Sequence, residues 1–203
     1  MRPDEIEQAS MSIIAEELGD RVIPKERLPI VMRVIHTTAD FEFAETLAFS
    51  GDAVRAGREA LARGVSVVTD TRMAASGVNK KFVTAYGGMV LCHMADEDVA
   101  DEALERGVTR AVVSIERAAR DTPDAIFAIG NAPTALLRLC ELMDEGKARP
   151  SLVIGAPVGF VNVLEAKEAL MRTNVPWIVA RGRKGGSPVA AAIVNALLYG
   201  SSC

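Results

Sequence analysis

Residues 125–134 read Ala125-Ile126-Phe127-Ala128-Ile129-Gly130-Asn131-Ala132-Pro133-Thr134, an apolar run that ends in a glycine turn. The apolar run has the length of a buried strand, and residues 135–144 that follow it have the composition of a helix. The same order returns downstream, where a predicted strand at 152–155 precedes a predicted helix at 163–171. Strands that alternate with helices predict an α/β fold with a mostly parallel sheet.

The alternation extends along most of the chain. Residues 110–115 are predicted to be a strand, or a strand that breaks into a helix. Further strands are predicted at 65–69, 89–94 and 176–180, and further helices at 52–63, 96–106 and 189–198. We therefore expect one domain over 1–203, with two N-terminal helices within 1–40, an alternating part over 65–198, and helices on both faces of the sheet.

Composition excludes several classes of protein. The chain has 203 residues, of which 49% are hydrophobic and only 4% aromatic, and its formal net charge is -4. It has no basic run with stacking aromatics, so no nucleic-acid partner is expected. No apolar stretch approaches the roughly 20 residues that cross a bilayer, and residues 1–5 lack the apolar core of a signal peptide. A cytoplasmic protein without a membrane partner is the expectation.

The cysteines give no metal or disulfide pattern. Cys92, Cys140 and Cys203 are an odd number without C-x-x-C spacing, which is typical of reduced thiols. Cys92 is followed by His93, but neighbouring side chains on a strand point to opposite faces. No metal site is expected.

The first predicted helix, at 4–18, carries a serine among its apolar residues. The apolar positions have helical spacing, and they are Ile6, Ile13, Ile14 and Leu18. Ser10 is four residues from both Ile6 and Ile14, which places it on that face. Its hydroxyl either bonds back to its own helix, the commoner case, or is presented to a ligand.

The second predicted helix, at 28–36, ends in a dense polar stretch, Arg33-Val34-Ile35-His36-Thr37-Thr38-Ala39-Asp40. Thr37 and Asp40 have the spacing of a helix-capping pair, which would explain both. His36 is one of two histidines in the chain. The C-terminus of a helix stabilises an imidazolium, which suits a general acid, although a purely structural histidine is more common.

Polar and glycine-rich turns follow the predicted strands. Thr69-Asp70-Thr71 comes directly after one strand, and Gly130-Asn131, Gly155-Ala156 and Gly182-Arg183 follow others. In a parallel sheet these turns gather along one edge, where helix N-termini favour carboxylates or phosphates. The loop at 181–187 adds three cations, so we expect anion binding here. Asp70 serves equally well as a cap for the next helix.

Several cofactor and nucleophile motifs are missing. The chain has no G-x-G-x-x-G after a strand, no G-x-x-x-x-G-K-[ST], no G-x-S-x-G and no H-E-x-x-H. A nucleotide cofactor, a serine hydrolase and a zinc peptidase are therefore disfavoured. The residues alone indicate a cofactor-free α/β enzyme or an anion-binding module, with His36 as the best candidate acid.

Taken together, the motifs resemble the precorrin-8X methylmutase family of cobalamin biosynthesis, which includes the cobalt-precorrin-8 methylmutases. The resemblance extends from about residue 3 to residue 198. It rests on blocks that occur in one order, namely Arg33-Val34-Ile35-His36, Thr69-Asp70-Thr71-Arg72-Met73, Gly77-Val78-Asn79-Lys80, Gly130-Asn131-Ala132-Pro133-Thr134-Ala135-Leu136, Pro157-Val158-Gly159-Phe160-Val161 and Gly182-Arg183-Lys184-Gly185-Gly186-Ser187.

The resemblance implies a reaction and an assembly. The family moves a methyl group from carbon 11 to carbon 12 of a corrin precursor by a 1,5-sigmatropic shift, giving hydrogenobyrinate or cobyrinate, and it uses no added cofactor. His36 matches the histidine that acts as general acid. The partner is a polycarboxylate corrinoid, and the family forms homodimers with the sites near the interface. A non-catalytic tetrapyrrole carrier is the alternative.

The resemblance and the anion-binding edge together define the expected substrate contacts. By resemblance, Ser10 and Arg110 contact the corrinoid. The other expected contacts are Arg33, Thr37, Thr69, Asp70, Thr71, Asn131, Arg183, Lys184, Gly185 and Ser187. The continuation Thr37-Thr38-Ala39-Asp40 and Lys184 resemble the branch in which the substrate already carries cobalt.

Overall fold

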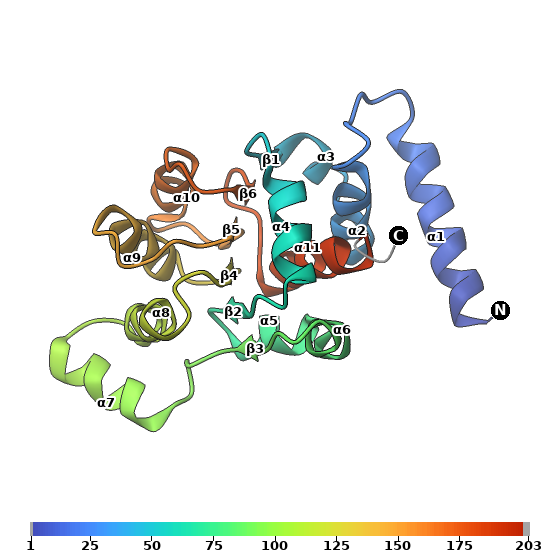
Figure 1. Ribbon diagram of the computed structural model, residues 1–203. Coiled ribbons are helices and arrows are strands. Elements are labelled where there is room, and N and C mark those ends of the chain that lie inside the picture. The colour runs from blue at the N-terminus through green and yellow to red at the C-terminus, as the bar shows by residue number, and fades with distance from the viewer. Residues whose placement is uncertain (1, 201–203) are drawn as a thin grey trace.

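Six strands form one sheet in the computed structural model, which describes residues 2–200 (Figure 1). Their spatial order is β1-β6-β5-β4-β2-β3, and every neighbouring pair is parallel except β1 with β6. The strands are β1 (Leu47–Phe49), β2 (Val67–Thr69), β3 (Val90–Leu91), β4 (Ile126–Ile129), β5 (Leu152–Gly155) and β6 (Trp177–Ala180). The predicted mostly parallel sheet is confirmed.

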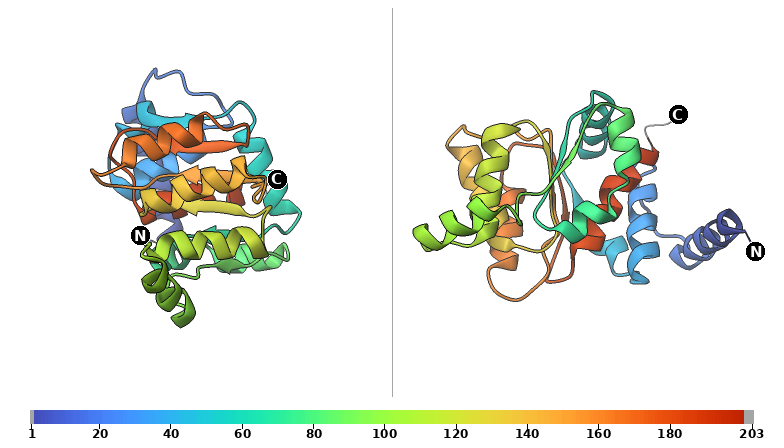
Figure 2. Two further views of the ribbon diagram at one scale, coloured as in Figure 1. Left: turned by 90° about the vertical axis from the view of Figure 1, so that its left-hand side faces the viewer. Right: turned by 90° about the horizontal axis from the view of Figure 1, so that it is seen from below.

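Helices cover both faces of the sheet, as expected (Figure 2). Successive side chains of a strand point to opposite faces, so Ile126 of β4 packs on one side and Phe127 on the other. The Ile126 side carries α2 (Leu28–Thr38), α4 (Ala53–Ala62), α5 (Arg72–Gly77), α6 (Lys80–Ala85) and α11 (Ser187–Tyr199). The Phe127 side carries α8 (Arg110–Asp121), α9 (Pro133–Asp144) and α10 (Val163–Met171).

Three further helices lie outside these layers. The short α3 (Phe43–Thr46) leads into β1, α7 (Glu97–Arg106) packs on α8, and α1 (Pro3–Leu18) packs on α2 at the rim of the molecule (Figure 1). Only part of the apolar face expected for α1 is buried. Ile14 and Leu18 are buried, but Ile6 and Ile13 are about half exposed, at 51% and 56%.

The prediction for residues 110–115 was wrong, because this segment is the first half of α8. Thr109 caps the helix, since its hydroxyl oxygen accepts a hydrogen bond from the Val112 N–H. Ala111, Ile115 and Ala118 are buried at helical spacing. The β-branched residues around position 112 had favoured a strand, and the burial of one helical face overrides that preference.

Two of the cysteines are free thiols, as expected. Cys140 is buried, and burial raises the pKa of its thiol to about 12, while Cys92 is partly exposed. Cys203 lies outside the described residues. Within residues 2–200 no group of three or more metal-ligating side chains is assembled, and no helix there is both long and apolar enough to cross a bilayer.

Candidate functional site

The turns after β4, β5 and β6 meet at one edge of the sheet, as the sequence predicted. The Ala156 N–H donates to the Ile129 carbonyl at 2.8 Å, and the Gly186 N–H donates to the Ala156 carbonyl at 2.8 Å. Gly185 packs so closely that a Cβ atom there would overlap the Ala156 carbonyl oxygen. Only glycine allows these two loops to lie this close together.

Asp70 lies at this edge, directly after β2, and its carboxylate does not cap the next helix, which was one of its two expected roles. Its side chain is fully buried, and its two oxygens accept hydrogen bonds from the N–H groups of Gly130, Asn131 and Ala132 at 2.9, 2.7 and 2.7 Å. Burial raises the pKa of Asp70, and these hydrogen bonds oppose the shift. The carboxylate therefore does not cap α5, and it occupies the N–H groups of this one turn. Contact between Asp70 and the substrate stays a prediction.

The hydroxyls around Asp70 also bond within the protein. Thr69 is fully buried and donates to the Thr71 and Leu91 carbonyls. The Thr71 hydroxyl caps α5 and lies 2.7 Å from the hydroxyl of Ser187, which is buried. The Thr69 hydroxyl thus links β2 to β3, and the Ser187 hydroxyl links α11 to the start of α5. Contact of Thr69 and Ser187 with the substrate stays a prediction. Asn131 is exposed at the edge itself.

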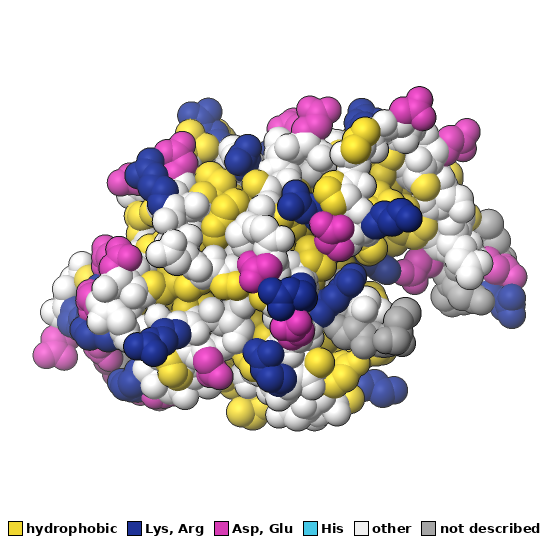
Figure 3. All heavy atoms as spheres, turned by 45° about the horizontal axis from the view of Figure 1, so that its top comes forward, with side chains coloured by type: hydrophobic (Ala, Val, Ile, Leu, Met, Phe, Trp, Pro, Cys, Tyr) yellow, Lys and Arg dark blue, Asp and Glu magenta, His cyan; other side chains and the backbone are white. Residues whose placement is uncertain are grey.

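Two of the three cations in the loop at 181–187, Arg183 and Lys184, make contacts within the protein. The Lys184 Nζ lies 2.7 Å from carboxylate oxygens of both Asp40 and Glu42, and this contact holds the pKa of Asp40 below its usual value. The Arg183 guanidinium lies over the exposed Phe160 ring, 5.6 Å from its centroid. Lys184 therefore joins the loop to the segment after α2. Both signs of charge are interspersed on the face in Figure 3.

His36 lies in the last turn of α2, as predicted, and its side chain is exposed. It lines a hollow of about 260 Å³ between α2, α5 and α11, together with Arg33, Thr37, Gly77, Pro188, Ala191, Ala192, Asn195 and Tyr199. Three predicted site residues, Arg33, His36 and Thr37, thus share one hollow. Pro188 directly follows Ser187, so the hollow adjoins the edge where the loops meet.

The predicted capping pair at Thr37 and Asp40 was wrong. Thr37 lies inside α2, and its hydroxyl donates to the Arg33 carbonyl at 2.9 Å. The helix instead ends at Ala39, which has a left-handed conformation with φ of 53° and donates its N–H to the Ile35 carbonyl. Asp40 is left to accept from Lys184 and from the Glu42 N–H.

Ser10 and Arg33 lie on the facing helices α1 and α2. The Ser10 hydroxyl donates to the Ile6 carbonyl at 2.9 Å, which confirms the local interpretation of this residue. Arg33 forms an ion pair with Glu7 of α1 at 2.8 Å, and its guanidinium lies 5.3 Å from the centroid of the Tyr199 ring. The cation therefore belongs to the wall of the His36 hollow.

Arg110 lines a different hollow from His36. It is exposed at the start of α8, beside Leu104 and Val108 in a depression of about 560 Å³ between α7 and α8. The hydroxyls of Thr109 and Thr134 lie 3.2 Å apart, so this end of α8 adjoins the start of α9. The structure places Arg110 near the same edge of the sheet, but not with His36.

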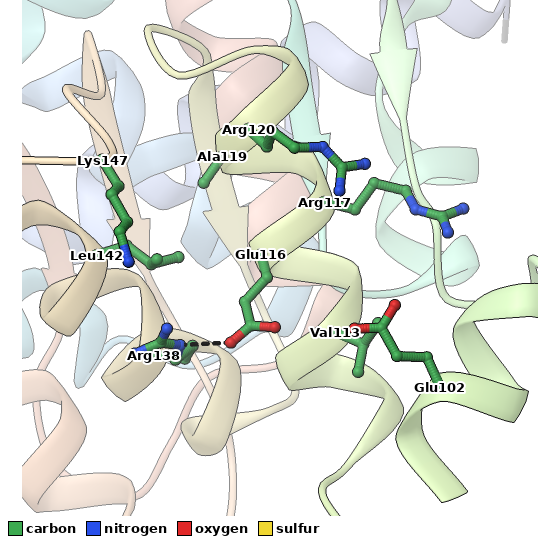
Figure 4. A pocket seen from close by; sticks show the side chains of 9 residues that line it. All are labelled: Glu102, Val113, Glu116, Arg117, Ala119, Arg120, Arg138, Leu142 and Lys147. Carbon is green, nitrogen blue, oxygen red and sulfur yellow. Dashed lines mark hydrogen bonds and ion pairs between the residues drawn. The ribbon is translucent and has the colours of Figure 1, made fainter. Parts of the chain in front are cut away.

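A hollow of about 510 Å³ between α7, α8 and α9 contains none of the predicted residues (Figure 4). Its charged side chains form ion pairs, either within the lining or with residues just outside it. Glu116 bonds to Arg138 at 2.7 Å and to Arg106, and these bonds hold the pKa of Glu116 below its usual value. We assign these ion pairs of Glu116 a structural role, because they hold α7, α8 and α9 together.

Comparison with known proteins identifies the family. The model of the precorrin-8X methylmutase family matches residues 5–200. The chain belongs to this family. It is 46% identical to the cobalt-precorrin-8 methylmutase of Priestia megaterium, covering 97% of this chain and 88% of that protein, and 43% identical to that of Salmonella typhimurium, covering 98% and 95%. The crystal structure of the Thermus thermophilus precorrin-8X methylmutase superposes with a TM-score of 0.91 at 43% identity, covering 98% of this chain and 96% of that one.

As a member of the precorrin-8X methylmutase family, the chain is an enzyme, a methylmutase of cobalamin biosynthesis and therefore an isomerase. The family assignment agrees with the resemblance inferred from the motifs. The matched region includes both the hollow around His36 and the edge where the loops meet. These two places are the candidate site.

Sequence reasoning missed one residue that this methylmutase uses to hold the edge in place. Lys167 of α10 is only 1% exposed, and its Nζ donates to the carbonyls of Gly182 and Lys184, each at 2.8 Å. Burial lowers the pKa of Lys167 to about 8. A neutral amine still has two N–H groups, which match the two carbonyls. The available signal was its position among Val163, Ala166 and Leu170, at core spacing on a helix.

This buried lysine predicts a pH dependence of stability. Because the pKa of Lys167 is lower in the folded protein than its ordinary value of 10.5, the unfolded chain binds more protons between these values. The free energy of unfolding should therefore rise from pH 8 to 10.5, by about 1–3 kcal/mol more than in a Lys167→Met variant. Urea unfolding of both proteins at the two pH values measures this difference, and parallel pH curves would contradict it.

Proposed function

We propose that the chain catalyses the 1,5-sigmatropic shift of a methyl group from carbon 11 to carbon 12 of precorrin-8X or cobalt-precorrin-8, giving hydrogenobyrinate or cobyrinate, with His36 as the general acid. The observation that carries the assignment of the acid is the position of His36, exposed at the end of α2 in a hollow that also holds Arg33. The other histidine, His93, bonds to Asp96 at 3.0 Å and does not line that hollow.

The proposed chemistry needs one proton donor and a shaped binding site. His36 as imidazolium donates a proton to the macrocycle, which becomes electron-poor. The bond from the methyl group to carbon 11 then breaks as the bond to carbon 12 forms. Substrate and product are isomers, so the proton returns and no cofactor is consumed. Further acceleration comes from holding the macrocycle in its reactive shape.

The surroundings of the hollow support a large anionic substrate. Arg33 lies inside the hollow, and Arg183 is exposed at the neighbouring edge. A hollow of about 260 Å³ lies below the ~300–1,000 Å³ of usual ligand pockets, so it would hold one side of a corrinoid. We propose that a homodimer, with its sites near the interface, encloses the remainder.

The cobalt-containing substrate is the preferred version of this proposal. The relatives from Priestia megaterium and Salmonella typhimurium carry the name cobalt-precorrin-8 methylmutase, whereas the Thermus thermophilus structure is named for precorrin-8X. Lys184 and Asp40 belong to the sequence features that resemble the branch in which the substrate already carries cobalt. Their side chains are bonded to each other at 2.7 Å.

Spectroscopy of the wild-type protein tests the proposal. Cobalt-precorrin-8 and precorrin-8X are each added to the purified chain, and the ultraviolet–visible spectrum is followed as the conjugated system changes. We expect conversion of at least one substrate to the cobyrinate or hydrogenobyrinate spectrum. Binding of the corrinoid without any conversion would favour the alternative, a non-catalytic carrier, and would contradict the methylmutase assignment.

A further inference from the structure

The block Gly77-Val78-Asn79-Lys80, for which the methyl shift provides no role, adjoins the His36 hollow, and its Gly77 lines it. Asn195 of α11 donates through its Nδ2 to the Gly77 carbonyl at 2.9 Å and accepts from the Asn79 N–H at 2.8 Å. A Cβ atom at Gly77 would lie 2.9 Å from the Cβ of Ala191, so glycine lets α5 end against α11. These contacts fix the corner between α5 and α6 to α11.

The same corner orients the ring of Tyr199. The Asn79 side-chain N–H donates to the Tyr199 hydroxyl at 3.3 Å. Phe82 packs against the ring edge-to-face, with 5.5 Å between the ring centroids and 79° between the planes. The guanidinium of Arg33 lies 5.3 Å from the centre of the ring. Three partners therefore hold Tyr199, yet it remains 39% exposed and lines the hollow.

Glu7 shows what Arg33 can bind in this place. A carboxylate oxygen of Glu7 lies 2.8 Å from the Arg33 guanidinium, which is 24% exposed and backed by the Tyr199 ring. The guanidinium is therefore accessible to a carboxylate from the side of α1. A substrate carboxylate would make the same charge-assisted hydrogen bond, either beside Glu7 or in its place.

The hollow therefore combines an acid, a cation that accepts carboxylates and a fixed aromatic ring. We propose that Tyr199 is a further substrate-binding residue, whose ring packs against the methylated, apolar periphery of a tetrapyrrole while Arg33 pairs with one of its carboxylates. Asn79 is a positioning residue, which acts by holding the Tyr199 hydroxyl. The inference rests on the proposed function. It adds Tyr199, which lines the same hollow as His36, as a surface against which the macrocycle lies.

The alternative is that Tyr199 only closes the end of α11 against Phe82. A large, fixed aromatic surface favours contact with an apolar ligand, because little conformational freedom is lost when the ligand binds. A purely structural ring would be needed for stability but would leave ligand affinity unchanged. Affinity and stability must therefore be measured separately.

The test uses the full chain and the corrinoid product, cobyrinate or hydrogenobyrinate, titrated by its absorption spectrum. We expect Tyr199→Met to raise the Kd for the product about tenfold, as for loss of an aromatic contact. Tyr199→Phe keeps the ring but loses the hydrogen bond from Asn79, so it should raise the Kd only about threefold. Tyr86→Met is the matched control, because Tyr86 is the other tyrosine of the chain and does not line the hollow. It should bind the product like the wild type.

Asn79→Ala provides a second test if Tyr199→Met does not fold. Its backbone N–H remains available to Asn195, so only the bond to the Tyr199 hydroxyl is lost. We expect this substitution to weaken product binding about threefold in the wild type and to have no effect in the Tyr199→Phe background. Equal effects in both backgrounds would overturn the positioning role of Asn79.

The outcomes separate the inference from the proposed function. If the wild type binds the product and a folded Tyr199→Met variant binds it equally well, the inference is overturned and the methylmutase proposal stands. If the wild type neither binds nor converts a corrinoid, the proposed function fails and the inference fails with it. A loss of affinity in Tyr199→Met that is clearly larger than the loss in Tyr199→Phe supports the inference.

Discussion

Replacement of His36 by glutamine should lower the rate of methyl migration by at least about 10²-fold, the smallest usual contribution of a general acid. Glutamine keeps polarity and a similar length, but it cannot donate a proton as imidazolium does. His36 is exposed at the end of α2, so little packing is lost and the fold should survive. Single-turnover absorption kinetics with saturating substrate measures the change.

Product binding separates chemistry from recognition in this variant. The Kd of His36→Gln for the corrinoid product should stay within about threefold of the wild-type value, because Arg33 and Tyr199 remain in the hollow. His93→Gln is the matched control, since it removes the other histidine of the chain and should retain activity. A fully active His36→Gln enzyme would exclude the general-acid role.

The second half of the sheet could be predicted because local signals and tertiary structure agree there. Runs such as 126–129 and 152–155 are apolar throughout and end in glycine, so their length and boundaries are visible in the sequence. β1 carried no such signal. It has three residues and pairs antiparallel with β6, about 130 residues away, so a long-range contact determines it.

The candidate site was only partly predictable for the same reason. His36 could be found from its residue type and its place at the end of a helix. Tyr199 and Asn195 could not, because they lie in a segment whose apolar residues predict an ordinary buried helix. Their importance comes from contacts with Asn79 and Gly77, more than 115 residues earlier.

Asp70 shows how a correct position can suggest the wrong partner. The sequence placed it at the carboxyl end of a strand, and the structure confirms that location. A carboxylate there suggested either a ligand contact or a cap of the next helix. The sequence contains no sign that three N–H groups some 60 residues later would converge on it. The partners of a buried charge depend on the packing of the whole domain.

Replacement of Asp70 by asparagine should lower the free energy of unfolding by about 3 kcal/mol. The carboxylate accepts three backbone hydrogen bonds at the turn before α9. Asparagine has one acceptor oxygen, and its amide N–H₂ would face N–H groups that then have no acceptor. Each buried donor that is left unsatisfied costs about 1–3 kcal/mol. Urea unfolding followed by circular dichroism measures the loss.

Asp124→Asn is the control for this variant, because it makes the same change of charge at an exposed position. It should unfold within about 0.5 kcal/mol of the wild type. An equally small effect in Asp70→Asn would mean that the three N–H groups do not depend on the carboxylate. If the large loss of stability is observed, the turn at 130–132 is held by the carboxylate of Asp70, which directly follows β2. This edge of the candidate site then depends on a contact between the segments that follow the paired strands β2 and β4, as well as on its own loops.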